Sequence, residues 1–474
     1  MFARLKRRTT ASQTSRFPHQ WWLVTSAGRI DRDVSRYTPG AGSIAPEPAQ
    51  TPWHLATRIT FRFCFVYLGL YVLFTQMLRS LIPFPIPFPQ FGVTAPMKNM
   101  VGWVGAHVLH VAKGVAPHPT GSGDTIYDWS QVVTLLLIAA IASAIWSFVA
   151  RDRREHARLN KWFRVFIRFA LATTFVSYGF SKVPPLQMPT TFLARLVEPY
   201  GNFSPMGVLW YSIGASPAYE MFAGAAEVFA ASLLFIPRTA GLGSMVALMD
   251  SIAIFTLNMT YDVPVKLFSF HLVLMSLFLL APNLVRLRDF FVLQRATAVR
   301  REEALGSTDR ARRNSVIAQI VYGGLVLVLG AYGGYQGWTR FGGGAPKSPL
   351  YGIWEIQRLT VDGRDSPALV SDSARWRRVV FQGPSTVTFQ RMNDSLVMFG
   401  TKIHASANSI EVTQFDSART KSTLTFERPA KDRLLLDGTL DKHAVHMELS
   451  YRDPDSFLIR SRGFNWVQEY PYNK

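Results

Sequence analysis

QVVTLLLIAAIASAIWSFVA, residues 131–150, contains no charged side chain. A helix needs about 20 apolar residues to cross a bilayer, because each unpaired backbone group in hydrocarbon costs several kcal/mol. The stretch therefore predicts a membrane-spanning helix. Six further stretches of this kind make seven expected spans, at residues 59–82, 129–150, 162–183, 218–237, 240–258, 265–281 and 316–334.

The composition of the whole chain agrees with lipid as a solvent. Its 474 residues include 34 Phe and 12 Trp, but only 17% are charged. The net charge of +20 comes from Arg and Lys clustered beside apolar runs, which indicates membrane topology and an anionic inner leaflet as partner, with no nucleic acid. The only cysteine, Cys64, excludes an intrachain disulfide and a site with several cysteine ligands.

The positions of the basic clusters predict how the chain is oriented. They occupy residues 4–36, 151–161 and 286–301, which belong on the cytoplasmic side. The connections between them, at residues 83–128, 184–217 and 259–264, contain few basic residues and belong outside. An odd number of spans then puts the N-terminus in the cytoplasm and the C-terminal domain in the periplasm or outside the cell. The basic, mixed start of the chain reads as a retained tail and not as a signal peptide.

These patterns divide the chain into six parts. We expect a cytoplasmic tail (1–56), two leading spans with an outer loop (57–160), a four-helix unit (161–291), a basic cytoplasmic helical linker (292–314), a seventh span (315–338) and an outer β-domain (345–474). Within the outer loop, the prolines of FPIPFPQF (84–91) exclude a continuous helix, and residues 101–111 predict a surface helix or a re-entrant hairpin.

The β-domain is predicted from short runs that alternate between apolar and polar residues. Examples are TVTFQ (386–390), RLLLDGTL (433–440) and FLIRSRGF (457–464), and eight or more such strands would close into an antiparallel barrel. The opening YGIWEIQRL (351–359) resembles the start of a lipocalin-like barrel, which implies that Trp354 plugs its closed end. A filled core and a bound ligand remain equal alternatives. The aromatic ending RGFNWVQEYPYNK (462–474) suits docking on the barrel or at the membrane surface.

Three ionisable side chains are expected near the middle of the membrane. Glu227, Asp250 and His271 stand at a similar distance from the cytoplasmic ends of their spans, about 14 to 15 Å deep at 1.5 Å per residue. Because charge in the bilayer is costly, we expect them to face one another. As catalytic residues they would form a proton relay or a pocket for a quinone head group, with His271 donating to a carbonyl. The alternative is that they only join helices through hydrogen bonds.

A second polar layer is expected near the outer surface. Its candidate substrate-binding residues are Lys182, Glu220, Lys266, Asn258 and Tyr178, with Asp262 nearby. Lys182 could pair with Glu220, and Glu220 shares a helix face with Glu227 across the small residues of EMFAGAAE (220–227). The lysines could instead extend towards the membrane surface.

Other polar residues carry weaker hypotheses. Arg168, on the third expected span, fits a side chain that reaches for the membrane surface. His107, His110 and His118 could bind a metal or haem, but they are too few to predict one, and surface exposure is the alternative.

Residues 164–291 resemble the four-helix unit of the DoxX family. The resemblance rests on RFALATTFVSYGFSKVPPLQMP (168–189), YEMFAGAAEVFAASLLFIPRTAGLG (219–243) and YDVPVKLFSFHLVLMSLFLLAPNLVRL (261–287). The family pattern maps onto Gly179, Lys182, Glu227, Arg238 and Gly243. It implies a bacterial inner-membrane protein, in some members linked to quinone-dependent sulfur oxidation or redox-stress complexes. The two leading spans, the seventh span and the barrel depart from the family's simple form.

Three functions follow from these observations. The first is a quinone-linked redox accessory or oxidoreductase subunit, with quinone as its cofactor and membrane or periplasmic redox proteins as partners. The second is binding or transport of a small apolar ligand through the outer barrel, without chemistry. The third is a scaffold for membrane assembly. No phosphate-binding loop, nucleophile elbow, metalloprotease helix or dinucleotide fingerprint is recognised in the sequence.

Overall fold

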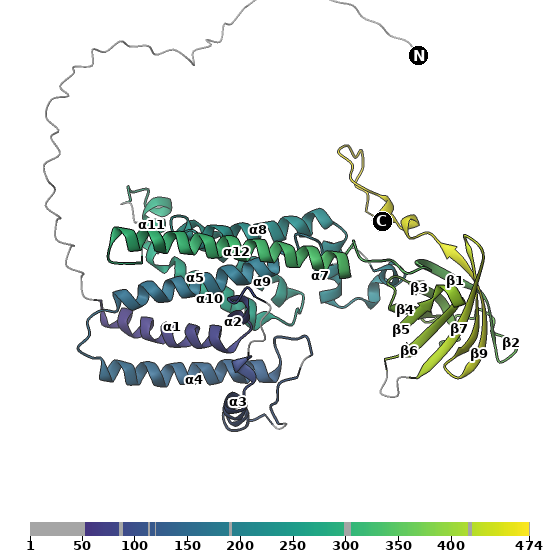
Figure 1. Cartoon of the computed structure of the whole chain (residues 1–474), viewed down its shortest axis with the longest axis horizontal. Coiled ribbons are helices and arrows are strands. Elements are labelled where there is room, and N and C mark those ends of the chain that lie inside the picture. The colour runs from purple at the N-terminus through teal and green to yellow at the C-terminus, as the bar shows by residue number, and fades with distance from the viewer. Residues whose placement is uncertain are drawn as a thin grey trace, which may run out of the picture. The chain divides into compact units, whose positions relative to one another are not determined.

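The computed structural model describes residues 53–84, 89–111, 114–118, 120–188, 192–297, 305–415 and 420–473. The expected cytoplasmic tail therefore lies almost wholly outside the described residues, as do parts of the proline-rich loop and of the basic linker. The described chain forms a helical part followed by a β-barrel (Figure 1).

The long helices match the apolar stretches of the sequence. They are α1 (Leu55–Phe74), α4 (Ile126–Val149), α5 (Ala157–Gly179), α8 (Pro217–Phe235), α9 (Ala240–Thr260), α10 (Lys266–Leu280) and α12 (Asp309–Phe341). The shorter helices are α2 (Met77–Ser80), α3 (Ala95–His107), α6 (Leu193–Leu196), α7 (Pro205–Gly214), α11 (Leu284–Leu287) and α13 (Leu458–Ser461). Single 3-10 or π turns cover Phe91–Val93, Tyr200–Asn202, Ala281–Asn283, Arg288–Val292, Ala405–Ala407 and Pro454–Ser456.

Within the described ranges, six helices are long and apolar enough to cross a membrane. They are α1, α4, α8, α9, the segment Lys266–Val292 that begins with α10, and α12. The third expected span corresponds to α5, which is 23 residues long but carries four basic residues, among them Arg164 and Arg168. Arg164 donates to the carbonyl oxygens of Phe278 and Leu279 at the end of α10, so part of this charge is used to join helices.

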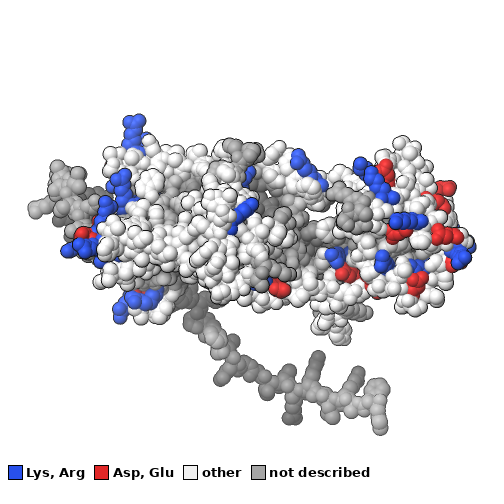
Figure 2. All heavy atoms as spheres, turned by 90° about the horizontal axis from the view of Figure 1, so that it is seen from below, with Lys and Arg blue, Asp and Glu red and all other residues white. Residues whose placement is uncertain are grey.

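Helices α5, α8, α9 and α10 form the centre of the helical part. Each packs against the next in sequence, and α10 returns to α5. Helix α1 packs on α4 and α5, and α12 packs on α8 and α5. On the face in Figure 2, basic side chains gather at one end of the helices, whereas charges of both signs cover the barrel. The helices between carry exposed apolar side chains such as Ile141 and Phe148, as lipid contact requires.

Arg168 does not reach for the membrane surface, so that interpretation is wrong. Its side chain is buried, and its guanidinium donates to the amide oxygen of Gln319 on α12. Burial between two helices gives the charge a polar partner inside the protein, which removes the need to reach for water.

Within the described residues, nine antiparallel strands follow the last long helix. They are β1 (Gly352–Val361), β2 (Arg364–Asp365), β3 (Trp376–Phe381), β4 (Thr386–Arg391), β5 (Leu396–His404), β6 (Ser409–Gln414), β7 (Lys421–Ala430), β8 (Arg433–Leu440) and β9 (His443–Arg452). The short β2 pairs only with β1, and the other eight close into a barrel through the pairing of β1 with β9. The expected antiparallel barrel is confirmed.

One expected strand is wrong. Residues 457–464 form the short helix α13 and a coil instead of a strand. The physical reason is closure: β9 already pairs with β8 on one side and β1 on the other, so it offers no free edge to a further strand.

Candidate functional site

A buried ion pair joins α8 to the turn that follows α5. The Lys182 ammonium donates to Glu227 Oε1 at 2.6 Å, and both side chains are buried. The other carboxylate oxygen, Oε2 of Glu227, is buried and has no hydrogen-bond partner among the described residues. The pair therefore retains an unused acceptor inside the helical part.

Two glycines bring the helices close enough for this pair. A Cβ atom on Gly224 of α8 would lie 2.7 Å from the carbonyl oxygen of Gly179 and 2.7 Å from Cβ of Lys182. A Cβ on Gly179 would lie 2.9 Å from the carbonyl oxygen of Gly224. Any larger residue would push the backbones apart, so the close approach expected from the small residues of 220–227 is confirmed.

Glu220 has a different role from the one expected. One of its carboxylate oxygens accepts hydrogen bonds from the backbone N–H groups of Gln187 (3.1 Å) and Met188 (2.9 Å). The expected pair between Lys182 and Glu220 is therefore wrong. Because Glu220 is engaged by the loop after α5, Lys182 reaches the acid two turns further along α8.

Asp250 belongs to the same polar cluster. It lies on α9, close enough to interact electrostatically with both Glu227 and Lys182. Its Oδ2 atom is buried and without a hydrogen-bond partner among the described residues. Within the described residues, Lys182 forms its ion pair with Glu227, and each of the two carboxyl groups keeps an oxygen that can take a proton.

His271 is held by other contacts. Its Nδ1 atom lies 2.6 Å from the carbonyl oxygen of Leu267, so Nδ1 carries a hydrogen and donates. Its Nε2 atom lies 2.6 Å from the Tyr67 hydroxyl, which donates when the imidazole is neutral. The ring stacks on Tyr71 with centroids 3.6 Å apart. Both nitrogens are used within the protein, so His271 has no free hydrogen for a substrate carbonyl, and its partners come from α1 instead of the acid cluster.

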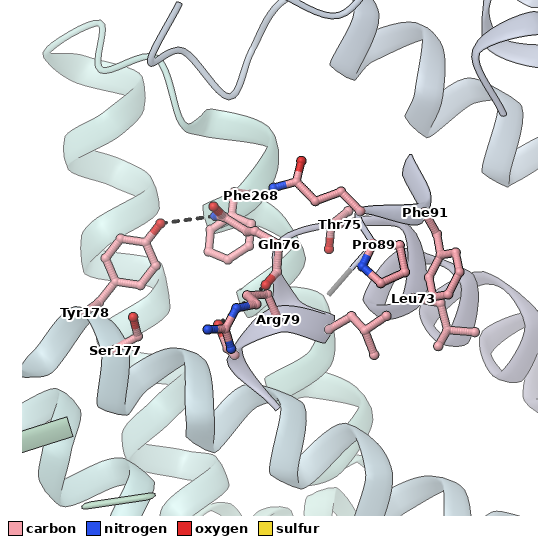
Figure 3. A pocket seen from close by; sticks show the side chains of 12 residues that line it. Leu73, Thr75, Gln76, Arg79, Pro89, Phe91, Ser177, Tyr178 and Phe268 are labelled. Atoms are coloured by element: carbon pink, nitrogen blue, oxygen red, sulfur yellow. Dashed lines mark hydrogen bonds between the residues drawn. The ribbon is translucent and has the colours of Figure 1, made fainter. Parts of the chain in front are cut away.

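A cavity of about 240 Å³ opens at the α2 end of α1 (Figure 3). Its donors include the guanidinium of Arg79 and the amide of Gln76, which also donates to the Tyr178 hydroxyl at 3.1 Å. None of the described residues that line it is acidic. The lining is Leu73, Thr75, Gln76, Leu78, Arg79, Ser80, Pro89, Gln90, Phe91, Ser177, Tyr178 and Phe268. Hydrogen-bond donors beside apolar and aromatic side chains suit an apolar ligand that carries hydrogen-bond acceptors.

Tyr178 connects this cavity to the buried ion pair. It lines the cavity with its hydroxyl bonded to Gln76, and the Lys182 ammonium lies 5.6 Å from the centroid of its ring. Tyr178 thus lies between the cavity and the buried Lys182–Glu227 pair. Tyr178 was predicted, whereas Gln76 and Arg79 were missed, because Gln76 lies in the break after α1 and Arg79 in the short helix α2, where the sequence predicted one continuous span.

The other candidates of the outer layer join helices. Asn258 of α9 donates to the Ser269 hydroxyl of α10 at 3.0 Å. The Lys266 ammonium pairs with Asp262 at 2.8 Å. Asp124, which the sequence reading missed, accepts from the backbone N–H groups of Lys266 and Leu267 and so caps the start of α10. Asn258, Lys266 and Asp124 do not line the cavity.

The histidines of the outer loop are exposed. His107 Nδ1 contacts the Trp103 carbonyl oxygen at 3.0 Å, and its ring stacks on the Trp103 indole. Among the residues that the structure describes, no group of three or more His, Cys, Asp or Glu side chains could hold a metal ion.

The interior of the barrel is filled with large side chains. Trp354 is completely buried, and its indole N–H donates to the Leu350 carbonyl oxygen at 2.9 Å. Phe381, Phe389 and Phe399 belong to the same buried cluster. These contacts favour the filled core over a bound ligand.

Fold and site thus define a polytopic protein with a polar site beside its helices and a β-barrel at its end. No known family model and no solved structure matches the chain. It is similar to the uncharacterized protein YwoB of Bacillus subtilis (strain 168), 32% identical over 122 residues that cover 24% of this chain and 71% of YwoB. Over that portion the chain belongs to the same family as YwoB.

Proposed function

We propose that this chain is a DoxX-like protein of a bacterial inner membrane that binds a lipid-soluble quinone in the cavity between α2, α5 and α10. It would act as a quinone-linked redox accessory or oxidoreductase subunit. The observation that carries the proposal is the cavity whose described lining combines hydrogen-bond donors with apolar groups and includes no acidic side chain, next to the buried Lys182–Glu227 pair that Tyr178 contacts.

The chemistry of the lining fits a quinone head group. The two carbonyl oxygens of a quinone accept hydrogen bonds, and Gln76, Arg79, Ser177 and Tyr178 offer donors. Phe91 and Phe268 provide aromatic walls for the ring. A volume of about 240 Å³ is small for a drug-sized ligand and suits a single-ring head group whose isoprenoid tail lies among the lipids.

The acids behind the cavity supply a place for protons. A bound quinone would bring two-electron, two-proton redox chemistry. Among the described residues, Glu227 and Asp250 each have a buried carboxylate oxygen without a hydrogen-bond partner, and the Lys182 ammonium contacts both Glu227 and the Tyr178 ring. These carboxyl groups can hold a proton that the head group loses or gains, while a membrane or periplasmic redox protein exchanges the electrons.

The proposed topology has seven spans, with α5 counted among them. Its length and its packing against α8 and α10 support that count, because its basic residues either lie at its first turns or are used inside the protein. Basic side chains at the α4–α5 and α10–α12 connections support a cytoplasmic position for these turns. The N-terminus is then cytoplasmic and the lipocalin-like barrel periplasmic.

Quinone binding can be tested with a matched pair of variants in lipid nanodiscs. Titration with a short-tailed ubiquinone or menaquinone analogue should saturate in the wild-type protein. Gln76→Leu should weaken binding by about tenfold, because it removes one hydrogen-bond donor of the cavity. The control is Gln336→Leu on α12, since Gln336 lies away from the cavity lining and donates to a tyrosine hydroxyl at the same 3.1 Å as Gln76.

Two results would contradict the proposal. One is wild-type protein that takes up neither analogue saturably. The other is equal affinity in the wild type and in Gln76→Leu at unchanged thermal stability, which would place any binding site elsewhere.

A further inference from the structure

The C-terminal segment, residues 462–473, exposes large apolar side chains one after another. Phe464, Trp466, Val467 and Tyr470 are 77%, 91%, 79% and 82% exposed. The Phe464 and Trp466 rings contact each other, with centroids 5.0 Å apart. Single exposed apolar residues are ordinary on a protein surface, but a run of them that includes Trp and Tyr marks a surface that binds something.

The barrel does not cover this segment. Among the described residues, the barrel core is built from strand residues and Leu350, and these four side chains take no part in it. Of the two alternatives that the sequence left open, docking on the barrel is therefore not what the structure has.

The segment starts at the end of the barrel that is tied to the spanning helices. Phe457, just before α13, packs with Ile353 of β1 and with Leu193 of α6. Helix α6 belongs to the connection between α5 and α8, and its Leu193 backbone N–H donates to the Gln382 side chain at 2.7 Å. Strand β1 follows α12 after residues 342–351, which span roughly 35 Å at most. The segment is therefore within reach of the bilayer that these helices cross.

The chemistry of the segment matches the lipid–water interface. Trp and Tyr gather at the level of the lipid head groups, because one end of each side chain is apolar and the other is polar. Arg462, at the start of the segment, suits lipid phosphates, and the segment contains a single acid, Glu469. Arg460, just before the segment, pairs with Asp455 at 2.8 Å.

We propose that residues 462–473 insert into the lipid–water interface on the barrel side of the membrane, with Trp466 as the main anchor. The occupant of this apolar surface is the phospholipid leaflet itself. The inserted segment would be the barrel's third attachment to the membrane part, besides α12 and the contact with α6, and it does not depend on quinone binding.

The test uses the full chain in nanodiscs of phosphatidylcholine and phosphatidylglycerol. Cys64, the only native thiol, is first replaced by alanine, and Val467→Cys is labelled with an environment-sensitive fluorophore. Nitroxide groups on the lipid acyl chains quench only labels that enter the bilayer. The label at residue 467 should emit at shorter wavelength and lose most of its emission in nitroxide nanodiscs, and adding Trp466→Ser should abolish that loss.

Val370→Cys provides the matched control. Val370 is an apolar residue in the β2–β3 connection of the barrel, with 81% of its surface exposed. Its label should keep its emission in the same nanodiscs. A label at residue 467 that behaves like the one at 370 would overturn the proposal. So would a shift to shorter wavelength without quenching, which would indicate docking on protein.

Discussion

Lys182 illustrates what one residue contributes to the site. It neutralises a carboxylate in a place where an unpaired charge costs several kcal/mol, and it links that carboxylate to the cavity through the Tyr178 ring. Removing only one member of a buried pair leaves the other charge without compensation. Replacing both members by neutral side chains leaves no unpaired buried charge.

We therefore expect Lys182→Met to lower the free energy of unfolding by about 3–5 kcal/mol. The double variant Lys182→Met/Glu227→Gln should regain most of that loss. Thermal unfolding in detergent measures both changes. A single variant as stable as the wild type would mean that the Glu227 carboxyl is already protonated when the chain folds.

At this scale the sequence predicted which residues are polar and buried, but not their partners. The spacing of Glu220 and Glu227 puts both acids on one face of α8, which the structure confirms by burying both. Lys182 pairs with Glu227 because the backbone N–H groups of Gln187 and Met188 occupy Glu220. The spacing of residues in the sequence does not predict where those N–H groups lie. For the same reason, Tyr67 as the partner of His271 could not be foreseen.

Elements were predicted more accurately than contacts. Apolar length locates the long helices to within a few residues at most ends, because the thickness of a bilayer fixes the length of a span. The exceptions are α12, which begins at Asp309 and extends well beyond the expected 316–334 at both ends, and α1, which ends at Phe74, well before the expected residue 82. The alternation of apolar and polar residues located the strands, because successive side chains of a strand point to opposite faces of the sheet. The break between α1 and α2, which forms the cavity, has no signal of that kind.

An outward-facing glutamate ties together the strands at which the barrel closes. Glu355 of β1 accepts hydrogen bonds from Arg378 of β3 (3.1 Å) and Arg452 of β9 (3.0 Å). Burial by itself would raise the pKa of Glu355, but the hydrogen bonds from the two arginines hold that pKa below its usual range. A carboxyl with a lowered pKa stabilises the fold above its unfolded pKa, and this stabilisation is lost as the pH falls through its folded pKa.

Glu355→Gln should therefore destabilise the barrel by about 0.5–1 kcal/mol at neutral pH, the size of one good cross-strand pair. The difference from the wild type should shrink as the pH drops below about 4. Calorimetric unfolding of the full chain in detergent measures this difference in stability. Glu427→Gln on β7 controls for the loss of one negative charge, because Glu427 is exposed. A difference that stays constant down to low pH would show that ionisation of Glu355 contributes nothing.

For the whole molecule, the distribution of basic residues predicts the side of the membrane on which each part lies. In intact bacterial cells, with Cys64 replaced by alanine, a membrane-impermeant maleimide should label Val370→Cys in the barrel once the outer membrane is permeable. It should label Arg288→Cys, in the turn after α10, only after the inner membrane is opened as well. The reverse pattern would invert the proposed topology.

The pairing of β1 with β9 also limits the order in which the molecule can be made. The first strand of the barrel finds its last neighbour only when β9, which ends at Arg452, has been synthesised, after all the other strands. By then α12 has left the ribosome. On the proposed topology the strands follow α12 through the translocon in an unfolded state. Until that final strand arrives, both edges of the growing sheet stay open to pairing with wrong strands, so the unfinished barrel is the stage of folding most exposed to aggregation.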